Sequence, residues 1–140
     1  MSTRENKLHV ADVMMSLDRL PVVDEHAMFK EALELMSKRQ LGIVCIVSNT
    51  SKLMGVLTDG DIRRMLLRVQ KPFSAIFAED VIDHAVRTPV TVNPSSKLTE
   101  AIKLMEEKHV WDLPVVDDGG TLLGLLHLHP AVEMLLGLKS

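Results

Sequence analysis

The chain has 140 residues, which is enough for one compact core or for two half-sized units that share one. The net charge of −3 and the aromatic content of 3% argue against nucleic-acid binding, which needs a basic field and stacking rings. No run approaches the roughly 20 apolar residues of a membrane span, and no apolar leader follows the polar start. Cys45, the single cysteine, lies in the apolar run IVCIV, so we expect it to be buried in a soluble, cytoplasmic protein.

The first half of the chain predicts an order of strand, helix, strand, strand and helix. A short helical approach at 9–15 leads to an extended piece at 21–23. The next helix carries its apolar residues at spacings of three and four, and they are Phe29, Ala32, Leu33 and Met36. The uncharged run 43–47 predicts a strand that is buried on both faces.

A turn at 48–52 and a strand at 53–57 follow this run, and a second helix begins just after Thr58. The apolar residues of that helix are Ile62, Met65, Leu66 and Val69. Residues 69–80 contain Pro72 and interrupt both periodicities, which predicts a linker.

The second half predicts the same order again. Its helix has an apolar stripe at Leu98, Ala101, Ile102 and Met105, and its strands are expected at 113–116 and 122–126, joined by a turn at 117–120. A last helix is expected from about Pro130. Sliding the sequence on itself by 69 positions places FKEALELM (29–36) on LTEAIKLM (98–105) and LMGVL (53–57) on LLGLL (122–126). This uniform offset indicates that one folded unit has been duplicated.

The two copies differ most where the second strand of each ends. After Gly55 the first copy reads GVLTDGDIRR, with Thr58 and Asp61, whereas the second copy has His127 and Pro130 at these positions. The duplication, the phrase GVLTDGDIRR and the phrase DLPVVDDGGTLLGLLH together resemble the cystathionine-β-synthase (CBS) domain pair, also called the Bateman module. More narrowly, TDGDIRR followed by GLLHLH is similar to the C-terminal CBS region of the arabinose 5-phosphate isomerase family.

The resemblance implies an α/β fold of two β-α-β-β-α units in pseudo-two-fold arrangement. We expect a first CBS domain at residues 8–69, a linker at 70–79 and a second CBS domain at 80–138. It also implies a nucleotide in the cleft between the units, contacted by the Thr and Asp of a GxxTxxD motif, here Gly55, Thr58 and Asp61. The base would rest on residues that match Pro21, Val22, Gly42, Ile43 and Val44.

Residues near this motif have both a binding and a structural interpretation. Thr58 and Asp61 are also spaced as a capping box, in which each side chain bonds the backbone amide of the other. Gly60 lets a ligand approach the backbone closely. Arg63 reaches a phosphate, or it and Arg64 are solvated charges on the helix.

His127 and His129, two residues apart, are expected on one face at the end of a strand. Two imidazoles at this spacing suit zinc, but no third ligand is obvious, so we favour polar walls of the cleft and predict no metal. We also find no nucleophile beside a base and no catalytic motif, and therefore expect no enzyme activity.

The function expected from these features is that of a regulatory module with no required cofactor. It would sense AMP, ADP, ATP or a CMP-sugar and control a sugar-phosphate isomerase in the same or a neighbouring gene. The alternative is a structural oligomerisation module without a ligand. In either case the apolar helices at 62–67 and 131–138 predict a homodimer, because they carry more apolar residues than one core face uses.

Overall fold

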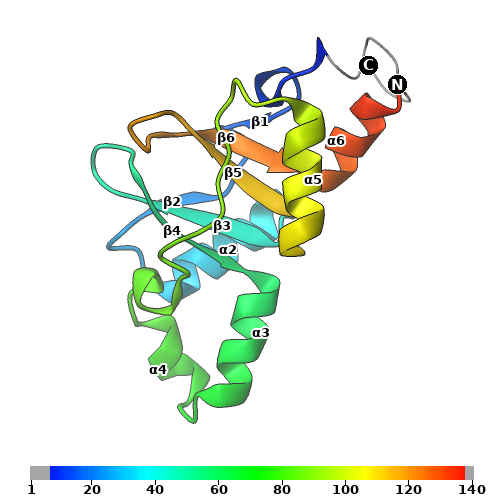
Figure 1. Cartoon of the computed structure of the whole chain (residues 1–140). Coiled ribbons are helices and arrows are strands. Elements are labelled where there is room, and N and C mark those ends of the chain that lie inside the picture. The colour runs from blue at the N-terminus through cyan, green and yellow to red at the C-terminus, as the bar shows by residue number, and fades with distance from the viewer. Residues whose placement is uncertain (1–6, 138–140) are drawn as a thin grey trace. The chain divides into compact units, whose positions relative to one another are not determined.

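The computed structural model describes residues 7–137 and divides them into two compact α/β units (Figure 1). One unit consists of residues 18–89, and the other joins residues 7–17 to residues 90–137. The predicted α/β class with two repeats is confirmed. The limits of the compact units differ from those of the expected domains. Residues 8–17, expected in the first domain, pack with the second repeat, and residues 80–89, expected in the second domain, pack with the first repeat. Leu138, the end of the expected second domain and last helix, lies outside the described residues.

The unit 18–89 is built on a three-stranded sheet in the order β2-β3-β4. The central strand pairs in parallel with β2 and antiparallel with β4. Its run IVCIV is buried on both faces as expected, and Cys45 is buried within it. The elements in chain order are β2 (Val22–Asp24), α2 (Phe29–Arg39), β3 (Ile43–Val47), β4 (Leu53–Thr58), α3 (Asp59–Arg68), α4 (Phe73–Phe77) and the 3-10 helix η2 (Val81–His84).

Residues 70–79, expected as a linker, contain α4 and contribute to the core of this unit. Ile76 of α4 is buried in the same cluster as Phe29 and Met36 of α2. The backbone continues to pack beyond α4, since the Glu79 carbonyl accepts a hydrogen bond from the Phe29 amide at 2.7 Å. The segment therefore belongs structurally to the unit that precedes it.

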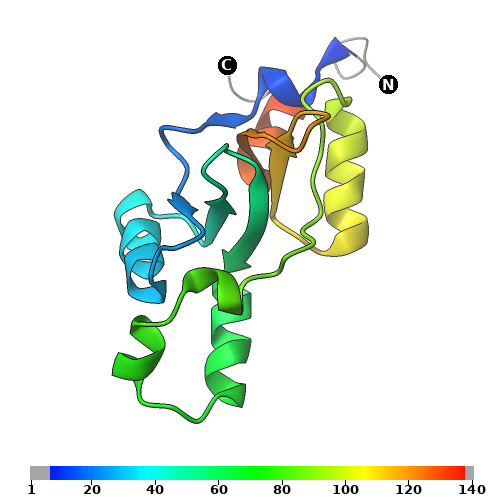
Figure 2. The same ribbon diagram turned by 90° about the vertical axis from the view of Figure 1, so that its left-hand side faces the viewer.

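The second unit is also built on a three-stranded sheet, in the order β1-β6-β5, but its third strand, β1, pairs antiparallel with β6, which corresponds to β4 of the first sheet. Its core gathers apolar residues from α5, β5, β6, α6 and the segment around Val10. In Figure 2, α5 (yellow) lies alongside β5 of the same unit. The elements in chain order are the 3-10 helix η1 (Val10–Asp12), β1 (Met15–Ser16), α5 (Leu98–Lys108), β5 (Asp112–Val116), β6 (Leu122–His127) and α6 (Leu128–Leu135). The last helix begins two residues before the expected Pro130.

The strand registers of the two units correspond residue by residue. Ile43 lies opposite Thr58, and Asp112 lies opposite His127, each at the offset of the repeat. Both hairpins also shift register at the corresponding step, between Ile46 and Val47 in one and between Val115 and Val116 in the other. The duplication in the sequence is thus a duplication of backbone geometry.

Glycine in the last strand of each hairpin lets a neighbouring segment pack directly against the backbone. A Cβ on Gly124 would lie 2.5 Å from the Met15 carbonyl oxygen, and one on Gly55 would lie 2.9 Å from the Val86 carbonyl oxygen. Met15 belongs to β1, whereas Val86 forms an isolated antiparallel bridge with Val56. A side chain at either glycine would displace backbone rather than a flexible side chain.

We therefore expect Gly124→Ala to lower the free energy of unfolding by about 1 to 2 kcal/mol, because the added methyl group pushes β1 away from β6. Gly60→Ala is the contrasting change. Its Cβ would meet only the mobile end of Arg64, at 3.2 Å, and alanine favours the helix by about 0.5–1 kcal/mol. Urea denaturation of both variants checks this, and equal stabilities would contradict the close approach at Gly124.

Across residues 7–137, none of the helices combines the length and the apolar character that crossing a bilayer requires.

Candidate functional site

The N-terminus of α3 is fixed by a reciprocal cap between Thr58 and Asp61. Thr58 has extended backbone angles, φ −110° and ψ 165°, so it ends β4 and is the N-cap of the helix. Its Oγ1 accepts from the Asp61 amide at 3.2 Å, and Asp61 Oδ2 accepts from the Thr58 amide at 3.1 Å. The capping box expected from the spacing is therefore confirmed, and it holds both side chains at the point where strand becomes helix.

Two side chains also donate hydrogen bonds to the carboxylate of Asp61. The Thr58 hydroxyl donates to Oδ2 at 2.8 Å, and Arg64 Nη2 donates to Oδ1 at 2.7 Å. Burial raises the pKa of Asp61, but the hydrogen bonds from Arg64 and Thr58 outweigh it and lower the pKa below its ordinary value. Asp61 is thus an ionised acceptor, with a side chain that is 19% exposed.

Arg64, rather than Arg63, is the arginine beside this carboxylate. Its guanidinium lies over Gly60, where an added Cβ would sit 3.2 Å from Nη1. The space that Gly60 leaves open is therefore used by this side chain. Arg63 is exposed on the helix.

The residues expected to hold a base lie on the neighbouring strands of the same unit. The Gly42 carbonyl accepts from the Asp59 amide at 2.9 Å, which places the start of β3 beside the start of α3. The Pro21 carbonyl accepts from the Cys45 amide at 2.9 Å, and Val22 follows it in β2. Ile43 and Val44 are buried in the sheet.

A shallow groove of about 340 Å³ opens on the same unit, at the end of α2. It is lined by residues of α2, by the turn after it and by Asp59. These residues are Leu33, Met36, Ser37, Gln40, Leu41, Gly42 and Asp59. Thr58 and Asp61 are not among them, so the groove and the capping box are separate features of the surface.

In the second unit the corresponding position carries an acid and an imidazole. His127 ends β6, and its Nδ1 lies 2.7 Å from Oδ1 of Asp112, the residue opposite it on β5. The expectation that His127 and His129 share one face of a strand is wrong, because the strand ends at His127 and His129 lies in α6. His129 instead pairs with Glu133, one turn along the helix, at 3.2 Å.

Asp112 has no role in the sequence analysis, although the structure places it beside His127. The sequence carried no signal for this pair, because counting back evenly from the turn at 117–120 places Asp112 opposite Leu125, whereas a register shift between Val115 and Val116 contributes to the observed pairing with His127. Among residues 7–137, no group of three or more His, Cys, Asp or Glu side chains is arranged to hold a metal ion.

The pH dependence of stability should reveal Asp112. Burial raises the pKa of its carboxyl, and the hydrogen bond from His127 offsets this only in part. The folded state therefore holds the proton to higher pH than the unfolded state, so this contribution to stability is complete below about pH 4 and is lost as pH rises through the folded pKa.

Asp112→Asn removes the titration and keeps a hydrogen-bond partner for the imidazole. We expect a flatter profile of unfolding free energy between about pH 4 and neutrality, with the variant at least as stable as the parent at the upper end. Asp83→Asn, at a carboxyl that is 63% exposed, is the control. A profile that Asp112→Asn leaves unchanged would contradict this account.

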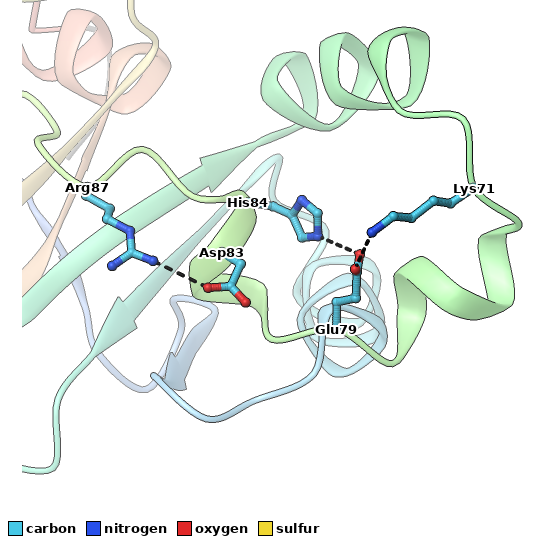
Figure 3. Close-up of polar contacts among 5 residues, drawn as sticks. All are labelled: Lys71, Glu79, Asp83, His84 and Arg87. Atoms are coloured by element: carbon cyan, nitrogen blue, oxygen red, sulfur yellow. Dashed lines mark hydrogen bonds and ion pairs between the residues drawn. The ribbon is translucent and has the colours of Figure 1, made fainter.

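A second group of polar contacts lies within residues 71–87 of the unit 18–89 (Figure 3). Glu79 accepts from Lys71 Nζ at 2.8 Å, lies 3.1 Å from His84 Nε2, and has its pKa lowered by these two hydrogen bonds. The His84 ring packs edge-on against Phe29 at 5.4 Å. Asp83 accepts from Arg87 Nη2 at 3.5 Å. His84, to which the sequence analysis assigns no role, therefore has a structural role through its contacts with Glu79 and Phe29.

Comparison with known proteins connects this geometry to a family. The chain is 33% identical over 126 residues to arabinose 5-phosphate isomerase KdsD of Salmonella typhi, a match that covers 90% of the chain but 37% of the isomerase. The chain thus spans little more than a third of the length of that relative.

Among solved structures, CBSX2 in complex with AMP has 29% sequence identity and a TM-score of 0.82, with 95% of this chain and 99% of that one covered. The CBS-pair protein CBSX2 from Arabidopsis thaliana has 28% identity and a TM-score of 0.80, with 94% and 96% covered. The sequence model of the CBS domain family matches this chain twice, at residues 10–68 and at residues 78–129. With two such matches over most of its length, the chain belongs to the CBS domain family and carries a pair of these domains.

Proposed function

We propose that the chain is a regulatory module that binds an adenine nucleotide or a nucleotide sugar at the N-terminus of α3. The observation that carries this proposal is the ionised carboxylate of Asp61, held in place by Thr58 at the start of a helix. A carboxylate accepts both vicinal hydroxyls of a ribose, and the amide dipoles of a helix N-terminus favour a phosphate. The AMP complex of the similar protein CBSX2 supports the choice of ligand.

The remaining predicted contacts complete the proposed site. Pro21, Val22, Gly42, Ile43 and Val44 would contact the base through backbone and apolar groups, and Gly60 and Arg63 would lie near the phosphate. A ligand of this kind regulates only through differential affinity, that is, by binding one conformation of the module more tightly than another.

The partner that we propose is a sugar-phosphate isomerase, because the chain is similar to one part of KdsD. The module itself is proposed to bind and not to catalyse. Incubation of the pure chain with arabinose 5-phosphate should give no turnover above the blank, and measurable turnover would contradict this assignment.

A thermal-shift screen against AMP, ADP, ATP and a CMP-sugar tests the binding function. A ligand at a hundred times its dissociation constant should add about 2.7 kcal/mol to the unfolding free energy. If none of these compounds raises the melting temperature, the alternative of a structural module without a ligand is the correct one.

A homodimer is proposed on separate evidence, the apolar residues that the helices leave exposed. Met65 of α3 is buried in its own unit, but Leu67 is 84% exposed and Leu66 is 39% exposed. Leu136, just after α6, is 61% exposed. A second copy of the chain would cover such residues. Sedimentation at tens of micromolar should therefore show a species heavier than 15.6 kDa, and a monomer alone would overturn this proposal.

A further inference from the structure

The ion pair between Arg64 and Asp61 limits what the carboxylate can still accept. An ionised carboxylate has about four lone-pair positions. Both positions on Oδ2 are occupied, by the amide and the hydroxyl of Thr58. One of the two positions on Oδ1 is occupied by Arg64. One position remains, which accepts a single hydroxyl but not a vicinal pair. A ribose that bonds through both hydroxyls must therefore displace one of the present donors.

Arg64 is the donor that is free to leave. The Thr58 amide is backbone, and the Thr58 hydroxyl is held by the hydrogen bond that it accepts from the Asp61 amide at 3.2 Å, whereas the Arg64 side chain is 60% exposed and reaches Asp61 from the next turn of the helix. Its guanidinium lies over Gly60, near the helix start. Once displaced, the guanidinium is a cation with no partner, held within side-chain reach of the first turn of α3.

We propose that Arg64 makes the site select a nucleotide over its nucleoside, by leaving Asp61 to the ribose and pairing with the phosphate. This inference rests on the proposed function and adds the specificity of the site. A nucleotide brings a new anion for the arginine that it displaces, and arginine binds phosphate through two parallel hydrogen bonds. A nucleoside carries no phosphate, so it displaces Arg64 from Asp61 without offering the guanidinium a new anion to pair with.

The test compares AMP with adenosine by calorimetry on the full chain and on Arg64→Ala; if the screen selects a CMP-sugar, the pair is CMP and cytidine. In the parent, we expect the nucleotide to bind more tightly than the nucleoside. In Arg64→Ala, the preference should fall by about tenfold, because the phosphate loses its partner while the nucleoside binds as well as before or better. Arg64→Lys, which keeps the charge but loses the planar pair of donors, should be intermediate.

Arg68→Ala is the matched control, since it removes the same side chain from the last turn of the same helix, and it should keep the parent's preference. Melting temperatures of all variants confirm that they fold. An unchanged preference in Arg64→Ala, or a loss of preference in Arg63→Ala instead, would overturn the inference while leaving the proposed function intact. A parent chain that binds neither compound of the pair and shows no shift in the screen would overturn both.

Discussion

Asp61→Ala should abolish measurable nucleotide binding. The change removes a carboxylate proposed to accept two ribose hydroxyls, a loss of about 2 to 4 kcal/mol, which moves a micromolar site toward millimolar affinity. It also removes half of the capping box, at a cost of about 1 kcal/mol in folding stability. Calorimetry of the variant with the nucleotide that the screen selects measures the first effect, and urea denaturation measures the second.

Two further variants separate binding from folding. Asp61→Asn keeps an oxygen that accepts from the Thr58 amide but loses the charge, so it should fold like the parent and still bind weakly. Asp83→Ala removes an exposed carboxylate from the same unit and should bind like the parent. An Asp61→Ala variant that binds as tightly as the parent would show that the ligand lies elsewhere.

Phe29→Ala should destabilise the unit 18–89 by about 3 to 5 kcal/mol, the cost of a large cavity in a packed core. Phe29 is 1% exposed. Its ring stacks on Phe77 with centroids 6.5 Å apart and contacts the edge of His84. The ring therefore joins α2 to α4 and to η2. Without it, Phe77 of α4 and His84 of η2 lose their aromatic contact with α2.

Phe29→Leu is the informative companion variant, since the second repeat carries Leu98 at the corresponding position and buries it completely. Leucine should cost about 1 kcal/mol, as expected for a change in shape within a core. Phe73→Ala, at an aromatic residue that is 62% exposed, should change stability by at most about 0.5 kcal/mol. If Phe29→Ala were no worse than Phe73→Ala in urea denaturation, the aromatic contacts would not be what holds α4 in place.

Most of the longer helices and strands of both units could be predicted from the sequence because their signals are local. The helical approach expected at 9–15 is instead the 3-10 helix η1 followed by the strand β1, and α4 and η2 were not expected. The stripe from Phe29 to Met36 and the uncharged run at 43–47 each reflect a single periodicity, and the spacing of Thr58 and Asp61 is a property of one helix start. The offset of the repeat then carried each assignment to the second half. The start of α6 was misplaced because proline is favoured in the first turn of a helix but does not mark its first residue.

The remaining features depend on contacts between segments that are distant in sequence. The pairing of β1 with β6, and the burial of Ile76 in the supposed linker, follow from tertiary packing that no local pattern encodes. The bond between Asp112 and His127 depends on the register of a hairpin. The placement of Arg64 on Asp61 depends on a side-chain rotamer, and the sequence did not distinguish it from Arg63.

The central claim is that one repeat binds a nucleotide and the other does not. The first repeat presents Thr58 and Asp61, whereas the second has His127, which is held by Asp112, and Pro130, whose side chain cannot accept a hydrogen bond from a ribose. Restoring an acid alone, as Pro130→Asp, should not create a second site, because His127 still occupies the position of the threonine.

The most direct measurement is the number of nucleotides bound per chain, determined by calorimetry on the parent and on Pro130→Asp with the nucleotide selected by the screen. We expect one nucleotide per chain in both. Two nucleotides bound to each parent chain would contradict the claim, because the second repeat would then bind without the groups on which the proposed site depends.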